Sequence, residues 1–118
     1  MTDLDVRIVE LMPMRVVSFL GFGKEPERSA WGQLLAWARP KGLIDDPTEH
    51  PLFGFDNPSP SPGSPNYGYE VWIKVDPEMP VEPGVKTLDF EGGLYAVARC
   101  PVPKGVAWLR ADDADGRR

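Results

Sequence analysis

The stretch YEVWIKV at residues 69–75 constrains the fold more than any other part of the chain. Its β-branched and aromatic residues predict a strand, in which successive side chains point to opposite faces. One face holds four apolar residues, Tyr69, Val71, Ile73 and Val75. The other face holds Glu70, Trp72 and Lys74. We predict that the first face packs on a core. The second face sets a carboxylate two residues from an indole, which favours a small-molecule site.

The overall composition is typical of one folded domain, which we expect to span residues 1–118. Apolar residues make up 42% of the chain and charged residues 26%. The net charge of -5 disfavours direct contact with nucleic acid, whose backbone is also negative. No apolar run approaches the roughly 20 residues of a membrane span, and the N-terminus lacks a signal-peptide pattern. With Cys100 as the only cysteine, these features favour a cytoplasmic protein that contacts no membrane.

The first third of the chain predicts a strand and then a helix. Residues 6–22 are rich in Val, Leu and Phe and predict one long strand, in which Pro13 marks a bulge or a bend. The apolar residues that follow recur at helical spacing, at Trp31, Leu34, Leu35 and Ala38. Pro26 suits the first turn of this helix. Pro40 and Gly42 favour its end.

The remaining segments predict shorter strands, at residues 52–56, 85–90 and 94–100. Residues 91–93 contain two glycines and fit either a single bulged strand or a hairpin between the last two strands. Residues 57–66 predict an exposed proline-rich loop, residues 106–109 suit the start of a helix, and the polar residues 111–118 predict a disordered tail. One helix on an antiparallel sheet of about four strands gives an α+β fold.

Five segments carry a resemblance to a known family. They are VELMPMRV at 9–16, the helix and its cap at 31–43, FGF at 53–55, YEV at 69–71 and GGLYAV at 92–97. In this order and spacing, they resemble the GyrI-like small-molecule-binding domain, which is also the effector-binding half of AraC-type and MerR-type regulators. The resemblance covers about residues 6–100.

The resemblance implies a fold of two strand-helix-strand-strand modules around a pseudo-twofold axis. Helices would cover one side of the sheet, and a ligand cleft would lie on the other side. Members of the family close the second module with a helix, two strands and a buried glutamate. Residues 110–118 are too short and too polar to supply them, so we expect an incomplete second module. Because folded proteins do not leave strand edges and apolar surface bare, we also expect a homodimer.

Glu70 and Trp72, with Tyr67 and Tyr95, are our candidates for an aromatic box around a cation or a planar ring. Phe55 is the fifth candidate ligand-binding residue, although packing alone would also explain it. In the alternative interpretation, Glu70 pairs with Lys74 on a solvated face and Trp72 packs on a neighbour.

The sequence offers no pattern for catalysis, metal or cofactor. His50 lies in a turn, without the serine or cysteine partner that a nucleophilic triad needs. Neither a metal-ligand spacing nor a phosphate-binding loop is present. We therefore expect no cofactor, no metal and no catalytic residue.

The resemblance favours a protein that binds amphipathic, aromatic or cationic molecules, as a multidrug-binding effector domain in transcription regulation. One alternative is a hydrolase of reactive electrophiles that uses Glu70 and Tyr95. The other is an inhibitor that binds a partner protein.

Overall fold

The computed structural model describes residues 6–46, 48–57, 62–100 and 106–110. Its first half is β1 (Val6–Leu11), β2 (Met14–Gly23), α1 (Pro26–Ala38), β3 (Leu52–Asp56) and β4 (Tyr67–Val75). Two short 3-10 helices, η1 (Arg39–Lys41) and η2 (Leu43–Asp45), follow α1. The second half is β5 (Lys86–Phe90), β6 (Gly93–Cys100) and β7 (Val106–Arg110). The fold is α+β, with the strands in one sheet in the order β1-β6-β7-β3-β4-β2-β5.

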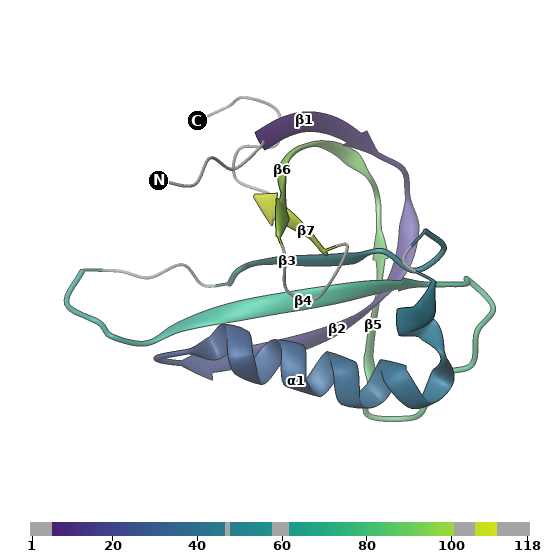
Figure 1. Cartoon of the computed structure of the whole chain (residues 1–118), viewed down its shortest axis with the longest axis horizontal. Helices are drawn as coiled ribbons and strands as arrows, with labels where there is room; N and C mark the ends of the chain where they lie inside the picture. The colour runs from purple at the N-terminus through teal and green to yellow at the C-terminus, as the bar shows by residue number, and fades with distance from the viewer. Residues whose placement is uncertain (1–5, 47, 58–61, 101–105, 111–118) are drawn as a thin grey trace.

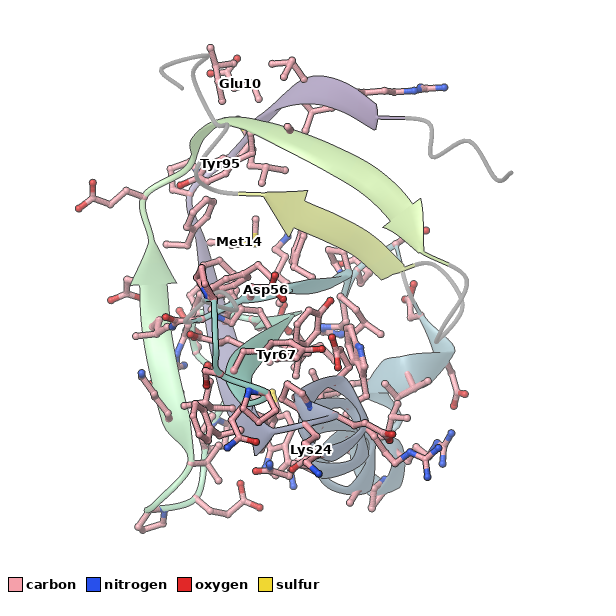
Figure 2. All side chains as sticks on the ribbon, turned by 90° about the vertical axis from the view of Figure 1, so that its left-hand side faces the viewer. Glu10, Met14, Lys24, Asp56, Tyr67 and Tyr95 are labelled. Carbon is pink, nitrogen blue, oxygen red and sulfur yellow. The ribbon has the colours of Figure 1, made fainter. Side chains whose placement is uncertain are left out.

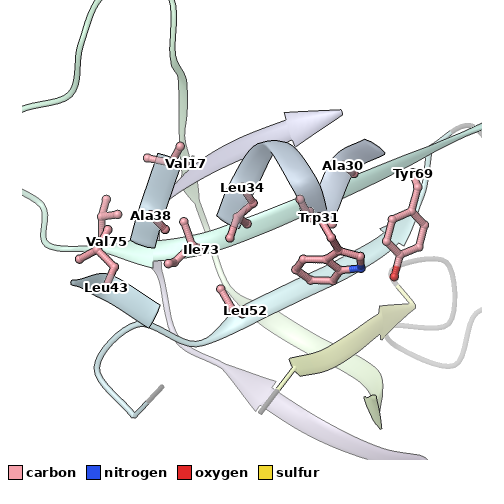
Figure 3. Packing of buried hydrophobic residues seen from close by; sticks show 11 residues of the cluster. Val17, Ala30, Trp31, Leu34, Ala38, Leu43, Leu52, Tyr69, Ile73 and Val75 are labelled. Carbon is pink, nitrogen blue, oxygen red and sulfur yellow. The ribbon is translucent and has the colours of Figure 1, made fainter. Parts of the chain in front are cut away.

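The core lies between α1 and the face of the sheet that the alternation in β4 predicts. Trp31, Leu34 and Ala38 of α1 are buried, which confirms the helical stripe. They form one cluster with the apolar face of β4, namely Tyr69, Val71, Ile73 and Val75. Figure 3 shows these side chains between the helix and the sheet. Burial of this face accounts for the position of α1, since apolar area removed from water is the main stabilising term.

The ends of α1 follow the predicted signals. Pro26 lies in the first turn, where its missing N–H removes no helical hydrogen bond. Beyond Ala38 the chain tightens into η1, which contains Pro40, and Gly42 then adopts a left-handed conformation with φ of 75°. This backbone conformation is one that glycine adopts without strain, so the helix stops where the sequence predicts.

The sheet folds over at a corner made of two adjacent bends. Met12 and Pro13 separate β1 from β2, and Glu91 and Gly92 separate β5 from β6. β1 pairs with β6, whereas β2 pairs with β4 and β5, so the two bends lie side by side. In Figure 1, β1, β6 and β7 accordingly lie across from β2 and β4, with β5 rising between the two parts. The face of the sheet opposite α1 thus becomes the inner face of a curved sheet, and we call it the inner face.

Gly92 allows the two bends of this corner to pack in close contact. Its φ is 86°, and a Cβ at this position would lie 2.5 Å from the carbonyl oxygen of Leu11 and 3.0 Å from the nitrogen of Pro13. A side chain would therefore collide with the backbone of the neighbouring bend. Only a glycine lets the two bends pack at this distance.

Three predictions about the strands were incomplete or wrong. Residues 6–22 form two strands because Pro13 interrupts the pairing, so the expected bend separates β1 from β2. β5 and β6 pair with neighbouring strands and not with each other, which makes the hairpin alternative wrong. Residues 106–110 form β7 and not a helix, because their backbone pairs with both β3 and β6. Within the described residues the sheet consequently has seven strands, not about four.

The strand-helix-strand-strand order holds for residues 14–75, from β2 to β4, with β1 before them and β5, β6 and β7 after them. Residues 58–61 of the predicted proline-rich loop and the predicted tail at 111–118 lie outside the described residues. Among the described residues, no helix is long and apolar enough to cross a membrane.

Candidate ligand-binding site

The pairing of the strands decides which side chains share the inner face. Directly paired residues of antiparallel strands project to the same side. Glu70 of β4 lies between Leu20 of β2 and Phe55 of β3. Two residues along, Trp72 lies beside Ser18 of β2. The predicted division of β4 into two faces is therefore confirmed, with Glu70 and Trp72 opposite α1.

Within the described part of the chain, three side chains donate hydrogen bonds to the buried carboxylate of Glu70. Only 6% of its surface is exposed. Its Oε2 accepts hydrogen bonds from Ser18 Oγ at 2.6 Å and from Trp72 Nε1 at 2.8 Å. Its Oε1 accepts one from Asn57 Nδ2 at 2.7 Å. All three donors are neutral, so these contacts orient the carboxylate without cancelling its charge.

The charge of Glu70 results from a competition between burial and hydrogen bonding. Burial raises the pKa of the carboxyl group, because it penalises the ionised form. The hydrogen bonds from Ser18, Trp72 and Asn57, helped by the charge of Lys86, lower the pKa and outweigh burial. The pKa of Glu70 ends below its ordinary value, and the group is ionised at neutral pH. Because Glu70 is buried and bonded to Ser18, Trp72 and Asn57, the alternative that places it on a solvated face is wrong. The other part of that alternative is confirmed, since Trp72 packs on the neighbouring rings of Phe55 and Phe90.

Four aromatic side chains from four strands form a continuous line of ring contacts beside Glu70. Phe55 meets Trp72 edge-on, with ring centroids 5.0 Å apart. Trp72 lies 5.3 Å from Phe90, and Phe90 lies 5.3 Å from Tyr95. We call Phe55, Trp72, Phe90 and Tyr95 the aromatic row. The hydrogen bond from the indole of Trp72, the second ring of this row, connects the row to the carboxylate.

The structure brings together four of the five candidate residues and separates the fifth. Glu70, Trp72 and Phe55 are direct neighbours, and Tyr95 lies at the far end of the aromatic row. Tyr67 is on the other face of the sheet, where its hydroxyl donates to Glu27 Oε2 of α1 at 2.5 Å. Figure 2 accordingly shows Tyr67 beside α1 and Tyr95 far from the helix.

The environment of Tyr67 also separates it from the aromatic row. Its hydrogen bond to the Glu27 carboxylate, followed by burial and the negative charge of Glu27, raises the pKa of Tyr67 to about 12. The phenol therefore stays neutral and bonded to α1 at physiological pH. It joins the helix to the sheet and does not contribute to the inner face.

Ser18, Asn57 and Phe90 belong to the site and were not predicted from the sequence. Ser18 had a signal, because it is the one hydroxyl in the otherwise apolar stretch VVSFL at residues 16–20. A buried hydroxyl needs a partner, and Glu70 is that partner. Asn57 and Phe90 carried no local signal, because only the pairing of distant strands places them near Glu70 and Trp72.

The inner face stays open beside Glu70. Leu20 is 52% exposed, and Phe22, two residues further along the same face of β2, is 65% exposed. A separate hollow of about 490 Å³ lies at the β4–β5 connection and is lined by Asp76, Pro77, Glu78 and Met79. It shares no lining residue with the aromatic row. Within the described residues, no group of three or more histidine, cysteine or acidic side chains could hold a metal ion.

Comparison with known proteins identifies a family for the chain. No curated protein matches the chain. The family model described as the GyrI-like small molecule binding domain matches residues 4–107, which include every element from β1 to β6 and the start of β7. The chain belongs to the family of GyrI-like small molecule binding domains.

Proposed function

We propose that the protein binds amphipathic small molecules with aromatic or cationic groups at the inner face, beside Glu70 and the aromatic row. The observation that carries this proposal is a buried, ionised carboxylate whose hydrogen-bond donors are all neutral. Because these donors are neutral, the carboxylate keeps its negative charge, and in a buried position it attracts a cationic ligand more strongly than it would in bulk water. The neighbouring rings of Phe55 and Trp72 offer π-faces and apolar area to the same ligand.

The experiment is a thermal-shift screen with flat aromatic cations. Compounds that bind the folded state and not the unfolded state raise Tm, and the increase grows with the logarithm of the ligand concentration above Kd. We expect this stabilisation to disappear in Glu70→Gln and in Trp72→Ala. It should persist in Tyr67→Phe, a matched control that removes a hydroxyl from the opposite face of the sheet. If no compound of the panel raises Tm, or if Glu70→Gln responds as the wild type does, the proposal is wrong.

We propose no enzymatic activity. The hydrolase alternative requires Glu70 and Tyr95 to converge on one water molecule, whereas Trp72 and Phe90 come between them in the row. A carboxylate with a lowered pKa is also a weak general base. Chemical conversion of a compound that binds would reverse this conclusion.

The biological role that we propose is that of a cytoplasmic effector domain in transcription regulation, working as a homodimer with a separate DNA-binding partner. The regulatory part rests on the resemblance to effector domains. The dimer is supported by exposed apolar residues on β1, β6 and the bend between β1 and β2: Ile8 at 60%, Met12 at 68% and Leu94 at 49%. Light scattering at micromolar concentration should give the mass of two chains, and Ile8→Asp should reduce it to one. A wild-type monomer under these conditions would contradict the dimer.

A further inference from the structure

The hydrogen bonds of Glu70 leave one acceptor position on a defined oxygen. A carboxylate offers about four acceptor positions, two on each oxygen. Both positions on Oε2 are occupied, by Ser18 and Trp72. Oε1 accepts from Asn57 alone among the described residues. Among the described residues, one acceptor position on Oε1 therefore remains unoccupied.

The two oxygens differ in their surroundings. Ser18, which donates to Oε2, is buried with 6% of its surface exposed. Asn57, which donates to Oε1, is an exposed residue directly after β3. The oxygen with the remaining acceptor position is thus the one whose partner is an exposed residue.

Apolar surface lies beside this carboxylate. Leu20 is the direct cross-strand neighbour of Glu70, and Phe22 pairs with Gly68, which has no side chain. Both apolar side chains are more than half exposed, although they lie on the same face as a buried anion. A ligand whose apolar part contacts Leu20 and Phe22 would therefore have its polar end close to Glu70.

We propose that Glu70 selects organic cations that carry an N–H donor, with the apolar part of the ligand resting on Leu20 and Phe22. This inference depends on the proposed function and sharpens it. A protonated amine can donate its N–H to Oε1 and so form a charge-assisted hydrogen bond. A quaternary ammonium ion has the same charge but no N–H, and it can approach the carboxylate only through its methyl groups.

The test compares two ligands by isothermal titration calorimetry at neutral pH, the protonated form of N,N-dimethyl-1-naphthylmethylamine and its N-methylated quaternary salt. They share one ring system and one charge. The hydrogen bond should make the protonated amine bind about tenfold or more tightly. The extra methyl group of the quaternary salt acts in the opposite direction, so this order cannot come from apolar contact.

The outcomes separate this inference from the proposed function. Equal affinities, or tighter binding of the quaternary salt, would overturn the inference and leave the proposed function intact. If neither ligand binds, both are wrong. Glu70→Gln should weaken the protonated amine more than the quaternary salt and remove the difference between them, and its circular dichroism and Tm would show that it is folded.

Surface variants test the position of the apolar part without touching the carboxylate. Leu20→Ser and Phe22→Ser should each weaken both ligands severalfold while preserving the ratio between them. Tyr67→Phe is the control, because it changes a side chain on the helix side of β4 and leaves the inner face unaltered. If all three variants bind with wild-type affinity, the apolar part lies elsewhere and the inference fails.

Discussion

Replacing Gly21 by alanine tests how closely α1 packs on the sheet. Gly21 lies on the helix side of β2, where it is paired with Tyr69. A Cβ at this position would lie 2.2 Å from the carbonyl oxygen of Pro26 and 2.9 Å from the nitrogen of Ala30. Both are backbone atoms at the start of α1, so no change of rotamer can relieve the contact. The helix itself has to move.

The size of the effect follows from these distances. Ordinary contacts of a Cβ begin at 3.4 Å, so the start of α1 must move away from β2 by about 1.2 Å. Overpacking of this kind typically destabilises by about 1–3 kcal/mol, and a backbone contact belongs near the upper end. In a domain of this size, about 2–3 kcal/mol corresponds to a decrease in Tm of roughly 10 °C.

Gly32→Ala is the matched control and should raise the free energy of unfolding, which Gly21→Ala should lower. Gly32 lies in the middle of α1 and is exposed, and a Cβ added there would have no atom within 4 Å outside the helix's own backbone. Alanine there should stabilise the helix by about 0.5–1 kcal/mol. Urea unfolding monitored by tryptophan fluorescence measures both variants. A Gly21→Ala protein as stable as the wild type would refute the close packing of α1, whatever Gly32→Ala does.

Three further predictions concern the corner, the carboxylate and the phenol. Gly92→Ala should lower the free energy of unfolding by about 2 kcal/mol or more in urea, because it combines a φ of 86° with a Cβ 2.5 Å from the Leu11 carbonyl oxygen. The pKa of Glu70 is lower in the folded chain than in the unfolded chain. Ionised Glu70 therefore stabilises the fold above the pKa that it has in the unfolded chain, and this stabilisation is lost as the pH falls through its pKa in the folded chain. Urea unfolding should therefore show a smaller loss of stability on acidification for Glu70→Gln than for the wild type. Spectrophotometric titration should show a tyrosine that ionises near pH 12, and Tyr67→Phe should remove it.

Local periodicity was enough to predict the part of the fold that depends on neighbours in sequence. The alternation in residues 69–75 predicts both the buried face and the inner face of β4, and the helical spacing of Trp31, Leu34 and Ala38 predicts the side of α1 that packs on it. Each of these patterns is set by the geometry of one element. These two predictions are confirmed because the core is built from a single helix and its adjacent strands.

The same rule of alternation would have excluded Tyr67. Tyr67 and Glu70 are three residues apart in one strand, so they must face opposite sides of the sheet. The predicted strand began at Tyr69, so the alternation did not extend to Tyr67, whereas β4 begins at Tyr67. The hydroxyl of Tyr67 accordingly lies on the helix side and donates to Glu27 of α1. By contrast, no local rule brings Asn57 to Glu70, because that contact depends on the register between β3 and β4.

The corner brings the rings of β5 and β6 to the same side of the sheet. Phe90 and Tyr95 are five residues apart, so in an uninterrupted strand their rings would lie on opposite faces. Their centroids are nevertheless 5.3 Å apart, because the bend at Gly92 resets the alternation between β5 and β6. The aromatic row is continuous only because this glycine allows the sheet to fold over. It follows that Gly92→Ala should impair ligand binding as well as stability, whereas Gly21→Ala, which acts on the opposite face, should reduce stability and leave the affinity of the folded protein nearly unchanged.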